Sequence, residues 1–158
     1  MLGAPVSRTV SALASGVLIT LGGLTILLAV YFLAFRPPLL PEDLRYIGGD
    51  PQLLSRPLRD WLTIVFHTWG GFIAGYGVML TGTGLFMLSG RKGWLVSATV
   101  LGLVVVFGRF LYSNIILGSD FLWIVGALFA LALAASGLLA LAARVRPERA
   151  AAQAARRP

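Results

Sequence analysis

The first apolar block of the chain reads TVSALASGVLITLGGLTILLAVYFLAF over residues 9–35, and its 27 residues include no charged side chain. A helix needs about 20 apolar residues to cross the hydrocarbon core of a bilayer. The blocks 61–90 and 121–143 also lack charges, and a fourth block, 93–118, is similarly apolar but contains Arg109. The sequence therefore predicts an all-α integral membrane protein, a four-helix transmembrane bundle with spans at 10–35, 60–89, 93–117 and 121–143.

The composition excludes a soluble enzyme and a disordered tail. Of the 158 residues, 58% are hydrophobic and 12% are charged, and the mean hydropathy is +0.87. Soluble domains carry about 25% charged residues, which small ones need to cover their surface. The chain has no cysteine, which excludes a disulfide, a thiolate metal site and a thiol nucleophile. We treat residues 1–158 as a single transmembrane domain.

The basic residues predict the orientation of the chain. There are 13 Lys and Arg against 6 Asp and Glu, a formal net charge of +7. In a soluble domain this charge would suggest nucleic acid, but here the basic residues flank apolar blocks, where they favour anionic lipid head groups. Eight Lys and Arg lie on the side of the two termini and the 91–92 turn, against four in the loop 36–59 and its flanks. Both termini are therefore predicted to be cytosolic, with the loop outside.

Two segments leave alternatives open. The block 9–35 could be a secretory signal peptide, but its length exceeds the 7–15 apolar residues of such signals, which favours an uncleaved helix. The tail 144–158 is rich in alanine and arginine. It could form a solvated cytosolic anchor, which its composition favours, or extend the last span as a surface helix.

Small residues are frequent in the predicted spans and favour close helix packing. The span 60–89 contains Gly71-x-x-x-Gly75 and Gly77-x-x-x-Thr81. We expect these faces to pack within the chain, with a dedicated dimer interface as the alternative. The short connections at 90–92 and 118–120 also predict that the second and third spans, and the third and fourth, are antiparallel neighbours.

The loop 36–59 contains signals for two short helical turns. Pro37-Pro38 ends the first span because proline lacks an amide donor and disfavours helix in the preceding residue. Pro41, followed by two acids, is typical of a helix start, and Gly48-Gly49 of its end. Asp50-Pro51 repeats the start signal. A lid over a site and a plain interfacial cover both fit this pattern.

Arg109 is the most informative residue because a charge within a span is costly and usually faces the bundle interior with a partner. One hypothesis is structural: Arg109 forms an ion pair with Asp60 or Asp120, or its side chain extends to the outer lipid head groups. The other is a polar pocket near the outer side, in which arginine's planar fork would hold a carboxylate, a phosphate or a quinone carbonyl. Its candidate ligand-binding residues are Arg109, Tyr112, His67 and Asp43.

Catalytic and metal-binding patterns are not found. His67 has no partner at ligand spacing, since the sequence contains no His-x-x-x-His, no Glu-x-x-His and no acid pair inside a span. A haem would need a second axial ligand, and Met79 lies 12 residues away, elsewhere on the helix and toward the other leaflet. We therefore predict no catalytic residues and no metal.

Several segments together resemble the DoxX-like group of small bacterial four-helix membrane proteins, over roughly residues 10–143. They are Leu40-Pro41-Glu42-Asp43-Leu44-Arg45-Tyr46-Ile47-Gly48, His67-Thr68-Trp69-Gly70-Gly71, Gly90-Arg91-Lys92, Phe107-Gly108-Arg109-Phe110 and Gly118-Ser119-Asp120. The resemblance implies the bacterial cytoplasmic membrane. We expect no cofactor. The resemblance implies a quinone as the alternative, because the group's best-known member is a subunit of a thiosulfate:quinone oxidoreductase.

These observations favour a small inner-membrane protein that is not an enzyme. We expect an accessory or assembly subunit, or a stand-alone bundle, whose partners are membrane lipids and other membrane subunits or further copies of itself, with no nucleic acid. The alternative is a binder of a lipophilic ligand such as a quinone near Arg109. Transport is a third, weaker hypothesis, because four spans form a thin pathway without repeated polar residues.

Overall fold

The computed structural model describes residues 3–50, 54–89 and 93–154, and the side chains of residues 9–143 within these ranges. In this part of the chain every regular element is helical. The elements are α1 (Gly3–Val30), the π-helical turn η1 (Tyr31–Phe35), α2 (Pro41–Ile47), α3 (Arg56–Ser89), α4 (Gly93–Leu117) and α5 (Leu122–Ala154).

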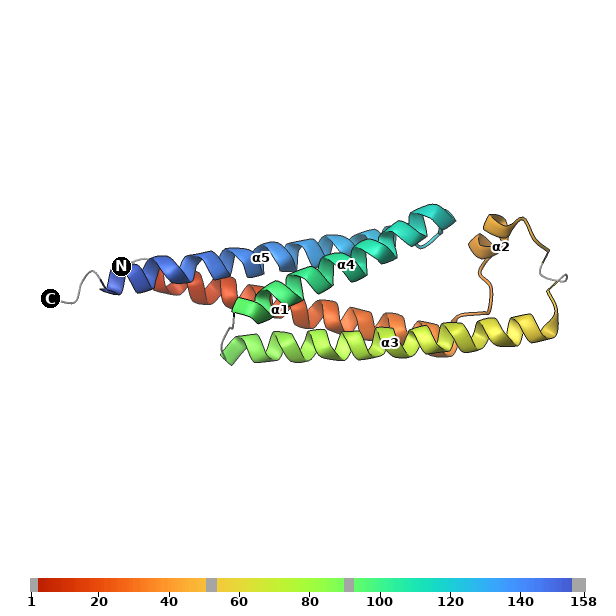
Figure 1. Cartoon of the computed structure of the whole chain (residues 1–158), viewed down its shortest axis with the longest axis horizontal. Coiled ribbons are helices and arrows are strands. Elements are labelled where there is room, and N and C mark those ends of the chain that lie inside the picture. Colours follow the sequence, from red (N-terminus) through yellow and green to blue (C-terminus); the bar gives the residue numbers. More distant parts are fainter. Residues whose placement is uncertain (1–2, 51–53, 90–92, 155–158) are drawn as a thin grey trace.

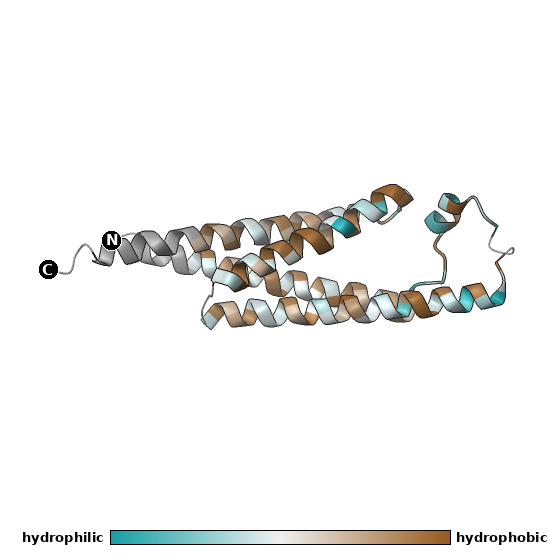
Figure 2. Ribbon diagram, viewed as in Figure 1, coloured by the Kyte–Doolittle hydropathy of each residue, from teal (hydrophilic) through white to brown (hydrophobic). Residues whose placement is uncertain are grey.

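Four helices are long and apolar enough to cross a membrane, over Thr9–Phe35, Arg56–Ser89, Gly93–Leu117 and Leu122–Ala143. Figure 2 shows how hydrophobic residues run along all four. A helix suits such segments because lipid offers no partner to backbone amides and carbonyls, which must bond within the segment. The predicted all-α, four-helix fold is confirmed, and the architecture is that of a multi-pass membrane protein.

Figure 1 shows how the helices pack: α1 contacts both α3 and α5, and α4 packs against α5. The start of α1 and the end of α5 lie at one end of the bundle, and α2 lies at the other, called here the α2 end. The predicted antiparallel pairing of α4 with α5 is confirmed. α3 and α4 also run antiparallel, as predicted, but the two helices diverge toward the α2 end (Figure 1).

The first span ends as its prolines predict. Its last turn is a π-helical turn in which the Arg36 amide donates to the Tyr31 carbonyl at 2.8 Å. Arg36 itself is extended, with φ −72° and ψ 121°, as expected for a residue before proline. The chain therefore leaves the helix directly after its aromatic segment.

The first predicted turn of the loop is confirmed as α2. The Leu40 amide donates to Asp43 Oδ2 at 2.8 Å, which satisfies one free donor at the helix start. Gly48 ends α2 at φ +60°, a conformation that glycine adopts without strain. The second predicted turn, at Asp50-Pro51, lies partly outside the described residues. At the other end of the chain, α5 continues to Ala154, so much of the tail extends the last span as a helix.

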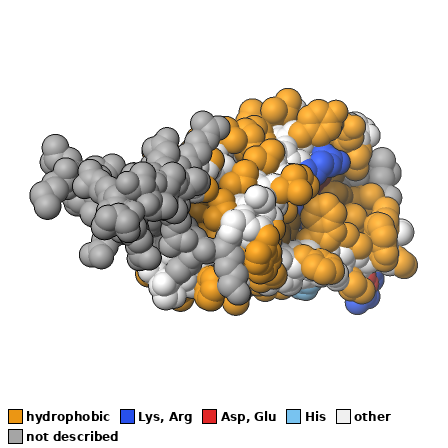
Figure 3. Space-filling view, turned by 60° about the vertical axis from the view of Figure 1, so that its left-hand side comes forward, with side chains coloured by type: hydrophobic (Ala, Val, Ile, Leu, Met, Phe, Trp, Pro, Cys, Tyr) orange, Lys and Arg blue, Asp and Glu red, His pale blue; other side chains and the backbone are white. Residues whose placement is uncertain are grey.

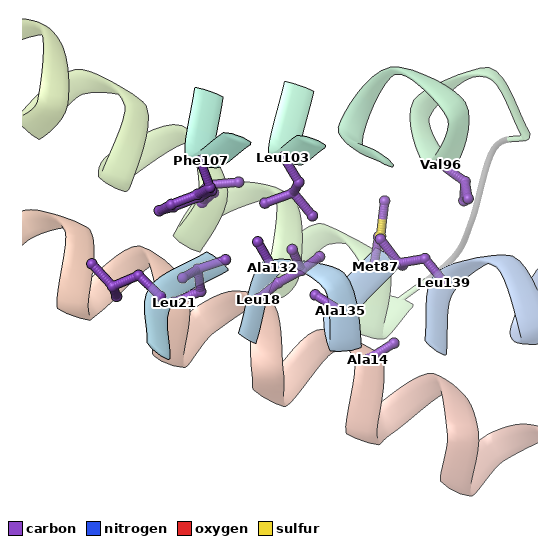
Figure 4. Close-up of a cluster of buried hydrophobic side chains, with 12 residues drawn as sticks. Ala14, Leu18, Leu21, Met87, Val96, Leu103, Phe107, Ala132, Ala135 and Leu139 are labelled. Atoms are coloured by element: carbon purple, nitrogen blue, oxygen red, sulfur yellow. The ribbon is translucent and has the colours of Figure 1, made fainter. Parts of the chain in front are cut away.

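The core contains side chains from all four spans (Figure 4). Leu18 and Leu21 come from α1, Met87 from α3, Leu103 and Phe107 from α4, and Ala132, Ala135 and Leu139 from α5. Tyr76 of α3 reaches across to Phe107, with 6.1 Å between the ring centroids. Large side chains therefore fill the wider space between α3 and α4.

Glycines bring α1 and α3 into close contact. Gly70, Gly77 and Gly84 are buried at seven-residue spacing, Gly77 and Gly84 against α1 and Gly70 against η1. A Cβ built on Gly77 would lie 2.9 Å from the Gly22 carbonyl oxygen, so the two backbones touch directly. The expected packing within the chain is confirmed for Gly77 of the Gly77-x-x-x-Thr81 motif. It is wrong for Gly71 and Gly75, which are exposed and have no atom within 4 Å of a built Cβ.

Candidate functional site

Arg109 lies on the outer surface of α4 rather than inside the bundle. Its guanidinium Nη1 donates to Ser113 Oγ at 2.7 Å, and its Cζ lies 5.4 Å from the centre of the Tyr112 ring. The predicted inward orientation is therefore wrong. The buried face of α4 is occupied by Leu103 and Phe107, and Arg109, two residues after Phe107, is rotated from this face by about 200°.

The structure does not form the predicted ion pair either. Asp120 accepts a hydrogen bond from Arg45 Nη2 at 2.8 Å, and Asp60 Oδ2 lies 4.0 Å from Arg56 Nε. Among the described residues, no ion pair includes Arg109. Arg45 and Arg56 lie closer to these two aspartates at the α2 end. Arg109 lies eight residues before the end of α4, and thus further from them.

The four candidate ligand-binding residues do not come together. Arg109 and Tyr112 are in contact on α4, but His67 is exposed on α3 and Asp43 lies on α2, paired with another arginine. In the part of the chain that the structure describes, no group of three or more His, Cys, Asp or Glu could hold a metal ion.

The polar groups that do converge lie around α2. Arg36 Nη2 donates to Asp43 Oδ2 at 2.9 Å, and the two side chains are only 5% and 14% exposed. The Arg36 guanidinium also covers the Phe66 ring of α3, with Cζ 3.3 Å from the ring centre. Burial lowers the pKa of Arg36, and the Asp43 charge opposes this shift. The guanidinium stays protonated, since arginine does not lose its proton in proteins.

A second buried contact joins α2 to the connection between α4 and α5. Glu42 is 2% exposed, and its Oε1 accepts a hydrogen bond from Ser119 Oγ at 3.1 Å. Its Oε2 has no hydrogen-bond partner within the described residues. Next to this contact, the Arg45–Asp120 pair is exposed to solvent, at 55% and 61%.

Together these contacts make residues 36–48 a strap, which is the name used for them below. Through Arg36 the strap is fixed to α3, and through Glu42 and Arg45 to the residues that follow α4. It thus joins α3 to α4 at the end where these two helices diverge (Figure 1). The strap therefore links α3 to the connection between α4 and α5.

The lateral surface has a shallow groove between α1 and α5. Its volume is about 510 Å³, and it is lined by Thr9, Ala12, Leu13, Gly16, Val17, Thr20 and Leu131. Figure 3 shows that the visible described surface is largely apolar, with charged side chains in a few small patches.

Sequence reasoning missed the contacts of Arg36 and Ser119, and it placed Asp43 in a pocket with Arg109. A signal for Arg36 was present, because it precedes Asp43 by only seven residues across a loop held short by prolines. Ser119 offered no such signal, since its contact with Glu42 joins residues 77 positions apart.

Comparison with models of known protein families, with curated proteins and with solved structures finds no match to this chain.

Proposed function

We propose that this chain is an accessory or assembly subunit of a membrane complex, which acts by binding a helix of another membrane protein rather than by catalysis. The observation that carries the proposal is a second row of glycines on α3. Gly71, Gly75 and Gly82 are exposed, and a Cβ built on any of them would meet no atom within 4 Å. This row is distinct from the row that packs against α1.

The exposed glycines Gly71, Gly75 and Gly82 lower the stability of α3, and no contact within the described chain offsets this loss. Glycine in a helix is about 1 kcal/mol less favourable than alanine, and a lipid-facing position imposes no need for a small residue. Beside the row lie exposed side chains, with Phe72 75% and Met79 70% accessible. Small residues flanked by large ones are typical of a surface that another helix approaches closely.

The distribution of basic residues and the apolar composition support a location and an orientation for the protein. We propose that the protein lies in the cytoplasmic membrane of a bacterium, with both termini in the cytosol and the α2 end outside. The distribution of Lys and Arg supports this orientation, with eight on the side of the termini against four around the loop. The resemblance to DoxX-like proteins supports the bacterial membrane.

The double substitution Gly71→Leu with Gly75→Leu tests the subunit hypothesis. We expect the parent chain, purified in mild detergent, to elute with a second membrane protein, which mass spectrometry identifies. The double variant should lose this protein because two leucines block the approach of its helix. Its thermal unfolding midpoint should stay close to that of the parent, since both positions are open.

The matched control is Gly23→Leu, an equally open glycine on α1, which should keep the partner. A parent chain that elutes alone as a monomer would contradict the proposal. Retention of the partner by the double variant would contradict the assignment to this face of α3.

A further inference from the structure

Arg109 has no carboxylate partner within the described chain, unlike three arginines at the α2 end. Arg36 pairs with Asp43, Arg45 with Asp120, and Arg56 approaches Asp60. Arg109 lies within the span Gly93–Leu117, is exposed, and forms no ion pair within the described chain. A charge on the lipid-facing side of a span is costly unless it reaches water or an anion.

The side chain of Arg109 extends along α4 toward the α2 end. Helical side chains normally tilt toward the N-terminus, but Nη1 of Arg109 bonds to Ser113, one turn further along the helix. Ser113 Oγ in turn donates to the Arg109 carbonyl at 3.0 Å, which fixes the hydroxyl as the acceptor for the guanidinium. The guanidinium is thus held in one position with its remaining donors free for another group.

This position lies close to the end of α4. The backbone of Arg109 lies eight residues before the end of α4, about 12 Å along the axis. Ser113 lies four residues before that end, which is about 6 Å. Extension toward Ser113 therefore moves the charge from the acyl region to the polar boundary, as long basic side chains do near span ends.

The surroundings suit a phospholipid. The Tyr112 ring lies against the guanidinium and is 58% exposed, and Val105, one turn before Arg109 on the side of the acyl chains, is 57% exposed. Tyrosine is common at the boundary of the bilayer, while apolar side chains contact the acyl chains. A guanidinium binds the oxygens of a phosphate through two parallel hydrogen bonds.

We propose that Arg109, Ser113 and Tyr112 form a binding site for the phosphate of an anionic phospholipid in the leaflet at the α2 end. The lipid is anionic because no carboxylate of the described residues neutralises the guanidinium, so a head group with net negative charge gains more than a zwitterionic one. Arg109 binds the phosphate, Ser113 positions the guanidinium, and Tyr112 covers one of its sides. The site is independent of the glycine row on α3.

Native mass spectrometry of the delipidated protein tests the site, with phosphatidylglycerol and phosphatidylcholine as the two probes. We expect the parent to bind phosphatidylglycerol more tightly than phosphatidylcholine. Arg109→Gln should weaken phosphatidylglycerol binding by about tenfold or more, because it removes a charged hydrogen-bond donor. Ser113→Ala should weaken it less, since the charge remains. Inorganic phosphate in excess should not displace the lipid, because it lacks acyl chains.

Arg59→Gln is the matched control, since Arg59 is an exposed arginine near the start of α3 and should not affect the site. Arg109 is exposed, so Arg109→Gln should unfold at the same temperature as the parent, which separates lost binding from misfolding. Equal binding of phosphatidylglycerol by Arg109→Gln and the parent would overturn the proposal. Equal affinity of the parent for the two lipids would also overturn it, as would displacement by inorganic phosphate.

Discussion

Gly77→Leu is expected to separate α1 from α3 and to lower the free energy of unfolding by about 3 kcal/mol or more. A Cβ at this position would lie 2.8 Å from Ile26 Cγ1 and 2.9 Å from the carbonyl oxygen of Gly22. The isoleucine side chain can rotate, but the carbonyl belongs to the backbone of α1 and cannot move without the helix. Without a hydrophobic effect between helices in lipid, this close contact supplies much of the attraction.

Gly75→Leu is the matched control because it adds the same side chain one half-turn away, where no atom lies within 4 Å of the new Cβ. Thermal unfolding of both variants in the same detergent measures the difference. The Gly77 variant should unfold at a clearly lower temperature than the Gly75 variant. If the two midpoints coincide, α1 and α3 do not pack through this glycine row.

Asp43→Ala is expected to cost about 3–5 kcal/mol, the usual effect of removing one partner from a buried ion pair. The Arg36 side chain is 5% exposed and would keep its charge without the carboxylate. The substitution also removes the hydrogen bond from the Leu40 amide, which helps to start α2. We therefore expect the strap to detach from α3 and the bundle to unfold at a lower temperature.

The exposed ion pair between Arg45 of the strap and Asp120 provides the control. Asp120→Ala breaks the contact with Arg45, and we expect a cost below about 1 kcal/mol because water solvates both groups. Replacement of both members of the buried pair, Arg36→Met with Asp43→Leu, should recover part of the loss, since no charge is then left buried. Equal effects of Asp43→Ala and Asp120→Ala on the unfolding midpoint would show that the strap does not depend on its buried pair.

The number and position of the helices could be predicted because charged residues end the apolar blocks. The third span was predicted at 93–117, and α4 has these bounds. Prolines and glycines likewise located the end of the first span and the bounds of α2. In each case the signal is local, so it can be read without knowing the neighbours of the segment.

The rotation of each helix could not be predicted in the same way. In lipid both faces of a span are apolar, so hydropathy does not distinguish the face of α4 that packs inward from the face with Arg109. The rule that a charge turns inward failed because Arg109 lies close enough to the end of α4 to extend toward the boundary. For α3, the motif Gly71-x-x-x-Gly75 predicts the wrong packing face. The buried glycines instead follow the seven-residue spacing of Gly70, Gly77 and Gly84.

The central claim is that four helices cross the membrane and leave α2 on the side opposite the end of α3. Cysteine labelling tests it directly, because the chain contains no cysteine of its own. Tyr46→Cys in α2 should react with a membrane-impermeant maleimide in intact bacteria, and Ser89→Cys at the end of α3 only after the cells are opened. Val105→Cys, exposed within α4, should react in neither case because lipid covers it. Reaction of Tyr46→Cys and Ser89→Cys from the same side of the membrane would contradict the account.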